Sequence, residues 1–381
     1  MKTNTKKIIS VMLSFVLLLS CSAFALAEGG TADKQYKNVI LFIGDGMGIN
    51  SINAAKWSGY DTPALDSMPV RGWSKTASAT SPVTDSAAGG TALACGVRTY
   101  NGGIGTFVLD PFSLFMVPAS LTEAAAQEGM STGVVTTDST SGATPASFSA
   151  HAYDRDDEDD ISNDQLTSGI NLIWGAASES VNRENCAANG YTYISTRAEM
   201  YALEAGTNSF AQFSSGDFSN LTNNNDTPTI AEMTGKAIQL LNADEDGFFL
   251  MVEGAHIDKK SHNKDMAGMT AQLNAFDEAV AIALAFAKLD GETVVVVTAD
   301  HETGGIKHNE KTGEYYYTSG SHTGVDVPLL VNVEDTAFEN GEAIKNAQVA
   351  RNLAEIIDTD GQMTLPYYNS PFIEYIKKLF G

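Results

Sequence analysis

The sequence predicts an α/β fold, a three-layer sandwich in which a mostly parallel central sheet is flanked by helices. Short, continuous apolar runs, typical of buried parallel strands, alternate with segments of helical spacing along most of the chain. A chain of 381 residues with 43% hydrophobic residues is long and apolar enough to bury such a core. The sequence has no internal repeat, so we expect a single domain over residues 28–381.

Residues 1–27 do not belong to the predicted domain. Three lysines precede an apolar run over residues 8–19, and residues 25–27 (ALA) form a small-x-small cleavage site. This pattern predicts a secretory signal peptide, and therefore a protein that is secreted, periplasmic or held at the cell surface. Residues 18–21 (LLSC) also resemble a bacterial lipoprotein box, which leaves a lipid anchor at Cys21 as an alternative. No later apolar run is long enough to span a bilayer.

Charge and cysteine content restrict the partners and the covalent framework. Loss of the leader's three lysines moves the formal net charge from −24 to about −27. A surface of this sign repels nucleic acid and phosphorylated molecules alike, so a phosphate site needs local positive charge, for which bound metal ions are the obvious source. Cys95 and Cys186 remain after cleavage and allow at most one disulfide. We expect Cys95 to pack in a helix as a small hydrophobic residue.

The first elements place a candidate ligand at the end of a strand. Residues 38–43 (NVILFI) are predicted as a buried strand, followed by Asp45 between two glycines and by a helix over residues 49–57. Ligands of open α/β sheets bind beyond the carboxyl ends of the strands, so Asp45 lies where a ligand is expected. A strand over residues 72–79 then leads to Ser86.

Ser86 stands between Asp85 and a run of alanine and glycine. If Ser86 begins a helix, its hydroxyl lies among unpaired backbone N–H groups that favour an anion. The small residues that follow would let a ligand approach the backbone closely. The alternative is that residues 84–86 only cap the helix. These residues alone leave both interpretations open.

The middle of the chain has weaker signals. We expect a helix over residues 121–128, a strand over 132–137, a loop over 138–142 and a short helix over 144–151. Residues 153–225 are rich in acidic residues, Asn, Ser and Thr, and we interpret them as an inserted cap or loop region outside the core sheet. The acidic run 154–160 is expected to be a solvated loop, with a calcium site as the alternative.

The C-terminal half returns to strong alternation. Met266, Met269 and Leu273 recur at helical spacing, which indicates a stripe facing the core rather than a cofactor site. The run TVVVVT is the plainest buried strand of the chain. The predicted elements are, in order, helix 229–242, strand 247–252, helix 264–289, strand 293–298, strand 327–333 and helix 342–357.

Metal-ligand residues follow three of these segments. Asp258 and His262 are four residues apart, so a helical turn would bring them to one face. Asp300 and His301 come directly after the strand TVVVVT and can ligate one ion together only if the strand has ended there. His322 is isolated in a loop of Gly, Ser and Thr. Mixed carboxylate and imidazole ligands suit zinc.

Six segments together resemble those of alkaline phosphatase and occur in the same order. They are NVILFIGDGMG, VTDSAAGGTALACG, GATPASFSAH, MVEGAHIDKKSH, VVTADHETGG and SHTG. They cover most of residues 38–328, and the shorter middle region matches least. The resemblance implies two Zn²⁺ ions and one Mg²⁺ ion, and also a homodimer.

The resemblance also implies a ligand set for each ion. One zinc would be held by Asp258, His262 and His322. The other would be held by Asp45, Asp300 and His301, beside the Ser86 oxygen. The magnesium ion would share Asp45 and would be held by Thr144 and Glu253.

Ser86 would be the nucleophile that becomes a phosphoserine during hydrolysis of small phosphate monoesters at alkaline pH. Arg155 falls where the family has an arginine that clamps two phosphate oxygens, and Asp85 would orient it. Lys259 matches a lysine that reaches phosphate through water in the enterobacterial enzyme. The chemistry is consistent with the residues, because a serine hydroxyl is a weak nucleophile unless a cation stabilises its alkoxide.

One position departs from the family pattern. Family members have an aspartate or a histidine two residues before the threonine ligand, where this chain has Gly142. That side chain holds water molecules around the magnesium ion, so its absence predicts a third site that binds metal weakly and an activity that depends on added Mg²⁺. His151 and His256 are expected to be structural, and His308 to be an ordinary loop residue.

Other activities share this metal scaffold. Sulfatases need a C/S-x-P-x-R pattern that Ser86 lacks, and an exported protein does not suit a sugar-phosphate mutase. Phosphodiesterases typically use threonine as the nucleophile and lack the arginine clamp, so Ser86 with Arg155 favours monoesters. A phosphodiesterase, or a non-catalytic surface protein that binds phosphate or metal, stays open as an alternative.

Overall fold

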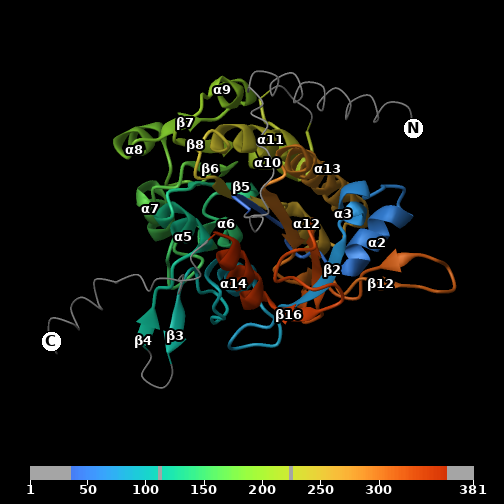
Figure 1. The fold of residues 1–381 in the computed structure, drawn as a ribbon. Helices are drawn as coiled ribbons and strands as arrows, with labels where there is room; N and C mark the ends of the chain where they lie inside the picture. The colour runs from blue at the N-terminus through green and yellow to red at the C-terminus, as the bar shows by residue number, and fades with distance from the viewer. Residues whose placement is uncertain (1–35, 110–113, 223–225, 358–381) are drawn as a thin grey trace. The chain divides into compact units, whose positions relative to one another are not determined.

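The computed structural model describes residues 36–109, 114–222 and 226–357 (Figure 1). The predicted signal peptide and the alternative lipid anchor at Cys21 lie outside the described residues. Export therefore stays a prediction. Among the helices of the described ranges, none is both long and apolar enough to cross a membrane.

One central sheet organises the described chain. Its strand order is β16-β2-β15-β10-β1-β9-β5-β6-β8-β7. In that order the strands are β16 (Ala343–Lys345), β2 (Val70–Lys75), β15 (Val327–Val331), β10 (Thr293–Thr298), β1 (Asn38–Ile43), β9 (Phe248–Glu253), β5 (Ser131–Ser139), β6 (Leu172–Ala176), β8 (Ser209–Phe213) and β7 (Thr192–Ile194). Only β15 runs against its neighbours β10 and β2 in this sheet, and every other pairing is parallel. The predicted mostly parallel α/β fold is confirmed.

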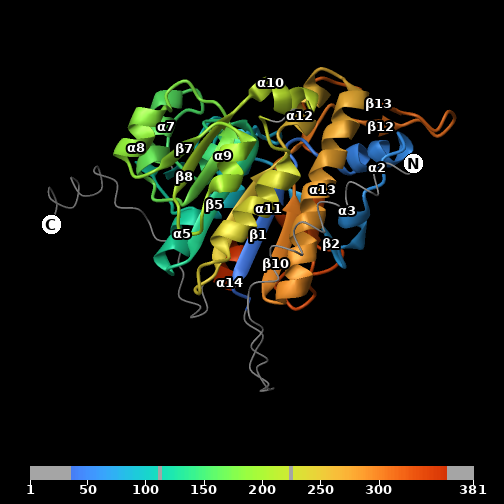
Figure 2. The ribbon, with the colours of Figure 1, turned by 90° about the horizontal axis from the view of Figure 1, so that it is seen from above.

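Helices cover both faces of the sheet (Figure 2). On one face lie α4 (Ser86–Cys95), α5 (Leu121–Gln127), α6 (Ala143–Ser147) and α14 (Asn346–Ile357). On the other lie α2 (Ile49–Trp57), α3 (Pro63–Ser67), α11 (Ile230–Leu241) and α13 (Met266–Asp290). This arrangement is the predicted three-layer sandwich. Its crossovers bring the carboxyl ends of the parallel strands to one edge of the sheet.

Strand β1 shows why the two helical layers form. All six of its residues are buried, and successive side chains point to opposite faces of the sheet. Leu41 belongs to the hydrophobic cluster that includes Leu93 of α4 and Leu353 of α14. Phe42 faces the other way, with its ring centroid 5.7 Å from that of Phe276 on α13. Each such buried side chain contributes about 1.5–3 kcal/mol, so an apolar run of this kind is stable only between two covering layers.

Residues 153–225 correct the sequence interpretation. The sequence predicts an inserted cap or loop region here, but β6, β8 and β7 extend the central sheet. All residues of β6 and β8 are buried, whereas β7, at the edge of the sheet, is only partly buried. The strands alternate with α7 (Glu158–Thr167), α8 (Arg183–Ala188), α9 (Arg197–Ala202) and α10 (Ser215–Asn220). Much of the polar composition belongs to helix starts, because Asn182, Thr196 and Ser214 each cap a helix by accepting backbone N–H bonds.

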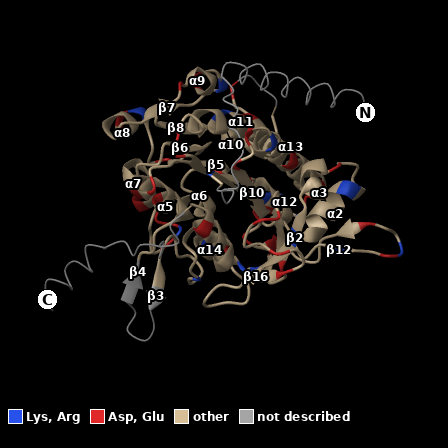
Figure 3. Ribbon diagram, viewed as in Figure 1, with Lys and Arg blue, Asp and Glu red and all other residues tan. Residues whose placement is uncertain are grey.

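The acidic run 154–160 is also only partly the expected loop. Residues 158–160 form the first turn of α7, where negative charge is stabilised by the positive end of the helix dipole (Figure 3). In the described part of the chain, the two groups of side chains that converge closely enough to hold a metal ion lie elsewhere. The calcium alternative therefore gains no support.

The remaining differences are short. The strand expected over 72–79 is β2 (Val70–Lys75), and the helix expected over 144–151 is the shorter α6. The helix expected from residue 342 begins at Asn346, because β16 occupies the residues before it. Cys95 packs in α4 as predicted, and both Cys95 and Cys186 are buried and unbonded.

Candidate metal centre and nucleophile

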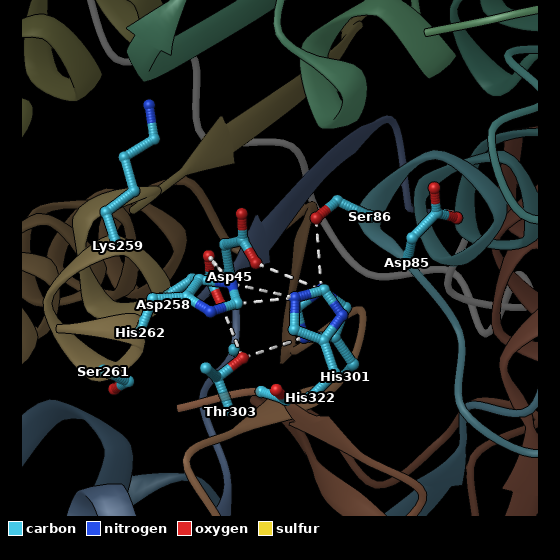
Figure 4. A network of polar contacts seen from close by, with 12 residues as sticks. Asp45, Asp85, Ser86, Asp258, Lys259, Ser261, His262, His301, Thr303 and His322 are labelled. Atoms are coloured by element: carbon cyan, nitrogen blue, oxygen red, sulfur yellow. Dashed lines mark hydrogen bonds and ion pairs between the residues drawn. The ribbon is translucent and has the colours of Figure 1, made fainter. Parts of the chain in front are cut away.

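The candidate ligands meet at the carboxyl edge of the sheet, as the strand ends predict. Asp45 follows β1, and Asp300 with His301 follows β10, which ends at Thr298. Asp258 lies on α12 (His256–His262), directly after β9. Figure 4 shows the side chains of Asp45, Asp258 and His301 pointing toward one another from separate elements.

Two groups of side chains converge closely enough to hold a metal ion. Their ligand atoms lie within 4.8 Å of one another, and His301 belongs to both groups. The groups are Asp45, Asp300 and His301, and Asp258, His301 and His322. His262 joins the second group, because its Nε2 lies 3.1 Å from Nε2 of His322 and 3.2 Å from Oδ2 of Asp258. The six zinc ligands implied by the resemblance are thus all gathered at one place.

The hairpin-like pairing of two short strands sets the position of His322. Strand β14 (His322–Thr323) pairs with β11 (Glu302–Thr303), which follows His301 directly. The rings of His301 and His322 stack with their centroids 3.6 Å apart. Nδ1 of His322 is 2.9 Å from the carbonyl oxygen of Thr84, which orients the ring and leaves Nε2 facing the cluster.

Ser86 is the first residue of α4, and Asp85 is its N-cap. The Asp85 carboxylate accepts the N–H of Ala88 at 3.0 Å, so the cap and the candidate nucleophile are different residues. The Ser86 hydroxyl is not used for capping and lies 3.1 Å from Nε2 of His301. The cap interpretation is therefore confirmed for Asp85, and the role of Ser86 as a nucleophile stays a prediction.

The glycines of α4 lie against other residues of the site. A Cβ on Gly89 would lie 3.0 Å from Cβ of Asp300, and a Cβ on Gly90 would lie 2.9 Å from Oγ of Ser147 and 3.4 Å from Cα of Thr144. The bare helix face therefore lets Asp300 and two residues of α6 approach α4. The approach of a ligand to this backbone, which the sequence predicts, stays a prediction.

Asp45 and Asp300 are buried at the centre of the site. Burial and the charge of Asp300 raise the pKa of Asp45 well above its usual range. Burial lowers the pKa of His301, so its ring is largely neutral at neutral pH although it lies 3.2 Å from Oδ2 of Asp300. Oδ1 of Asp45 and Oδ2 of Asp300 are buried and have no hydrogen-bond partner among the described residues. Such oxygens are costly to bury alone, and a metal ion would satisfy them.

A third candidate position lies beside this pair of groups. Glu253 ends β9 and is 1% exposed, and its carboxylate accepts a hydrogen bond from the hydroxyl of Thr136. Burial and then the charge of Asp138 raise the pKa of Glu253 to about 8. The buried hydroxyl of Thr144 lies within reach of the same carboxylate and acts to lower the pKa of Glu253. A hydroxyl beside hard carboxylate oxygens fits a magnesium ion.

The structure also brings together the predicted arginine and its partner. Nη1 of Arg155 lies 3.4 Å from Oδ2 of Asp85, and the same oxygen accepts the N–H of Gly102 at 2.9 Å. The backbone N–H of Arg155 donates to the carbonyl of Gly102 at 2.9 Å, which fixes the start of the arginine side chain. The guanidinium group is therefore held by Asp85, the residue next to Ser86 in the chain.

Lys259 does not lie with the imidazoles. In Figure 4 its side chain extends away from the three rings, and its ammonium group pairs with the carboxylate of Asp138. Two residues of the cluster were missed in the sequence: Asp138, and Thr303, whose hydroxyl donates to Oδ1 of Asp258. Asp138 was assigned to a loop, although its position near the end of a parallel strand was a usable signal.

The other histidines are placed as follows. Nε2 of His151 lies 3.2 Å from the carboxylate of Glu123, well outside the ligand groups, in keeping with its predicted structural role. His256 is buried. Burial lowers the pKa of His256 to about 4. His308 is exposed on β12 (Lys307–His308), with its ring 4.8 Å from that of Tyr315 on β13 (Tyr315–Tyr316).

Comparisons with known proteins agree on one family. The sequence matches the family model described as alkaline phosphatase over residues 36–173 and 179–326. It is 32% identical over 333 residues to alkaline phosphatase 3 of Bacillus subtilis, with 80% of this chain and 71% of that protein covered. It is 31% identical over 345 residues to the alkaline phosphatase of Escherichia coli, with 73% and 72% covered.

A solved structure supports the same comparison. The alkaline phosphatase of the Antarctic bacterium TAB5 superposes with a TM-score of 0.73 at 30% identity, covering 85% of this chain and 99% of that one. A variant of that enzyme, with Mg bound in the site called M3, superposes with a TM-score of 0.70, also at 30% identity, covering 85% and 98%.

Proposed function

This chain belongs to the alkaline phosphatase family, and on that premise we propose that it is an exported, metal-dependent phosphomonoesterase that works through a phosphoserine at Ser86. It would act on small phosphate monoesters at alkaline pH and release inorganic phosphate. The observation that carries the proposal is the position of Ser86. Its hydroxyl lies at the start of α4, 3.1 Å from a histidine shared by both groups of metal-ligating side chains.

The residues present fit the cations that the proposal needs. Asp45, Asp300 and His301 would hold one zinc, and Asp258, His262 and His322 the other. Asp45, Thr144 and Glu253 would hold a magnesium ion, which the relative with Mg bound in M3 supports. The buried oxygens of Asp45 and Asp300 that have no hydrogen-bond partner among the described residues favour this assignment. When bound, such cations lower the pKa of a hydroxyl or water and neutralise phosphate oxygens.

The chain's own residues bind and orient the phosphate. The backbone N–H groups at the start of α4 that Asp85 does not cap would favour an anion beside Ser86. Arg155 offers a planar fork that can contact two phosphate oxygens at once, and Asp85 restrains it from behind. A monoester dianion has enough free oxygens for this clamp and for the cations together. We therefore propose monoesters rather than diesters as substrates.

The acidic composition makes the local positive charge decisive. The chain carries 47 Asp and Glu against 23 Lys and Arg, and acidic side chains occur on many elements (Figure 3). A phosphate would be repelled by this surface unless the cations and Arg155 offset it. Export and the homodimer implied by the resemblance are parts of the proposal that still need their own measurements.

Hydrolysis of p-nitrophenyl phosphate and of its bis-ester tests the proposal. We expect turnover of the monoester that EDTA abolishes, that added Zn²⁺ and Mg²⁺ restore, and that Ser86→Ala lowers by several orders of magnitude. EDTA-resistant turnover, or a Ser86→Ala protein as active as the parent, would reject the mechanism. Equal rates on both esters would instead support a phosphodiesterase. No turnover of either ester by the metal-loaded protein would favour a binding protein.

A further inference from the structure

Gly142 lacks the polar side chain that the family pattern has at this position, and the carboxylate of Asp138 lies in the space that such a side chain would occupy. A Cβ on Gly142 would lie 2.8 Å from Oδ2 of Asp138 and 3.0 Å from the carbonyl oxygen of Ser139. Real side chains do not approach so closely, so the Asp138 carboxylate already takes up the space that a side chain at residue 142 would need. A carboxylate is therefore present next to Gly142, although the sequence supplies it four residues earlier.

Asp138 is fixed relative to the proposed magnesium ligand Glu253 by a short relay. In the pairing of β5 with β9, Thr136 stands level with Glu253. The Thr136 hydroxyl donates to Oε2 of Glu253 and accepts the backbone N–H of Asp138 at 2.8 Å. One hydroxyl thus ties the backbone of Asp138 to the carboxylate of Glu253.

The two oxygens of Asp138 have different environments. Oδ1 accepts the N–H of Ser139 at 2.7 Å and pairs with the ammonium group of Lys259. Oδ2, the oxygen that faces Gly142, has no hydrogen-bond partner among the described residues. Lys259 and Ser139 therefore hold the carboxylate while one oxygen stays available to water or a cation.

The partner of Asp138 comes from the segment that follows a proposed magnesium ligand. Glu253 ends β9, and Lys259 lies on α12 directly after it. The ammonium group of Lys259 pairs with Asp138, whose carboxylate lies against Gly142, two residues before the buried Thr144. Asp138 is therefore placed between the segments that supply Glu253 and Thr144.

We propose that Asp138, held by Lys259, is the positioning residue for the third cation and replaces the side chain that Gly142 lacks. The inference rests on the proposed function, because it concerns the magnesium site of that same centre. Asp138 acts through the cation and its water molecules, and not on the substrate. The weak magnesium binding expected from Gly142 alone is then reversed: the parent protein retains Mg²⁺ after dialysis.

Transfer of the carboxylate between the two positions tests this proposal. Calorimetric titration of MgCl₂ into zinc-loaded, magnesium-free protein gives the affinity, and elemental analysis after dialysis gives the Mg²⁺ content. We expect Asp138→Asn to weaken Mg²⁺ binding about 10–100-fold, which is the usual effect of substituting a residue that orients metal ligands. The double variant Asp138→Ala with Gly142→Asp supplies the carboxylate from residue 142 instead of residue 138, and it should recover most of the Mg²⁺ affinity.

The controls separate this proposal from its alternatives. All proteins carry Ser86→Ala, so Mg²⁺ binding is read without turnover and its outcome is independent of whether the parent hydrolyses monoesters. Glu310→Gln removes one exposed charge far from the cluster and should leave Mg²⁺ affinity unchanged. Melting in EDTA reports folding. Unchanged Mg²⁺ affinity in Asp138→Asn, an equal loss in Glu310→Gln, or no recovery in a folded double variant would overturn the proposal.

Discussion

The hydroxyl of Ser86 lies 3.1 Å from Nε2 of His301, and this histidine is wholly buried. The same nitrogen lies 3.5 Å from Oδ1 of Asp45 and 3.2 Å from Oδ2 of Asp300. Since burial lowers the pKa of His301, the neutral ring offers a lone pair in the middle of three oxygens. A cation bound by this nitrogen would neighbour the serine directly.

His301→Gln is therefore expected to remove both zinc and activity. Glutamine keeps much of the volume but offers no imidazole nitrogen to a metal ion. We expect the zinc content to fall and kcat/KM to drop by more than about 100-fold. The loss of a residue that only hydrogen-bonds to a metal ligand already lowers metal affinity or activity by about 10–100-fold. Elemental analysis and initial rates measure both. His308→Gln, on an exposed strand, is the matched control, and full zinc content in His301→Gln would contradict the assignment.

The strongest sequence signals were those with a direct physical cause. The runs before Asp45 and Asp300 consist of buried residues, because parallel strands between two helical layers have no polar face. Their ends could be located to the residue, and ligands of such sheets gather at those ends. The spacing of Asp258 and His262 likewise gave a shared helix face, which α12 provides.

The missed features depended on distances that spacing does not encode. Strands β6, β8 and β7 are short, and the capping residues between them made the region look irregular. Asp138 comes near Glu253 only through the end of β5, where its pairing with β6 shifts register between Val135 and Ser139. The role of Gly89 depends on the approach of Asp300, some two hundred residues away in the chain.

Gly89→Ala should destabilise the protein although alanine favours helices. Ordinarily this change in a helix is worth up to about 1 kcal/mol of stability. A Cβ at residue 89, however, would lie 3.0 Å from Cβ and from the carbonyl oxygen of Asp300, and overpacking of this kind costs about 1–3 kcal/mol. Displacement of Asp300 should also reduce zinc content. Urea unfolding and elemental analysis measure the two effects.

Gly216→Ala is the matched control for Gly89→Ala. Gly216 also lies in a helix, α10, but a Cβ there would come no closer than 4.0 Å to a neighbouring heavy atom, Oγ of Ser214. We expect this variant to be about 0.4–1 kcal/mol more stable than the parent, with unchanged zinc content. Equal stabilisation by both substitutions would show that α4 has room at residue 89.

Arg155→Lys should weaken phosphate binding while it keeps the charge. A lysine presents one point charge and cannot form the two parallel bonds of a guanidinium fork. Charged hydrogen bonds are worth about 1.5–3 kcal/mol, so the inhibition constant for inorganic phosphate should rise about 10–100-fold. Competitive inhibition assays measure it. Arg183→Lys, at an exposed arginine paired with Glu199, is the control. An unchanged inhibition constant in Arg155→Lys would contradict the proposal that Arg155 clamps the phosphate.

The pair of His151 and Glu123 makes stability depend on pH at a place remote from the ligand groups. Nδ1 of His151 is 2.8 Å from the carbonyl oxygen of Gly105, and its backbone N–H donates to Asp164. Against the effect of burial, the hydrogen bond and charge of Glu123 raise the pKa of His151 above 6.5. Against the same effect, the partner histidine lowers the pKa of Glu123 below 4.5.

The stabilisation by this pair is complete between about pH 4.5 and 6.5. As pH rises through the raised pKa of His151, the histidine loses its proton and the stabilisation is lost. As pH falls through the lowered pKa of Glu123, the carboxylate gains a proton and the stabilisation is also lost. We expect His151→Gln to cost about 1–2 kcal/mol in the free energy of unfolding at pH 5.5 and clearly less at pH 8.5. Urea unfolding of parent and variant at equal metal content measures this difference, with exposed His308→Gln as control. A cost that is equal or larger at pH 8.5 would show that His151 acts by packing alone.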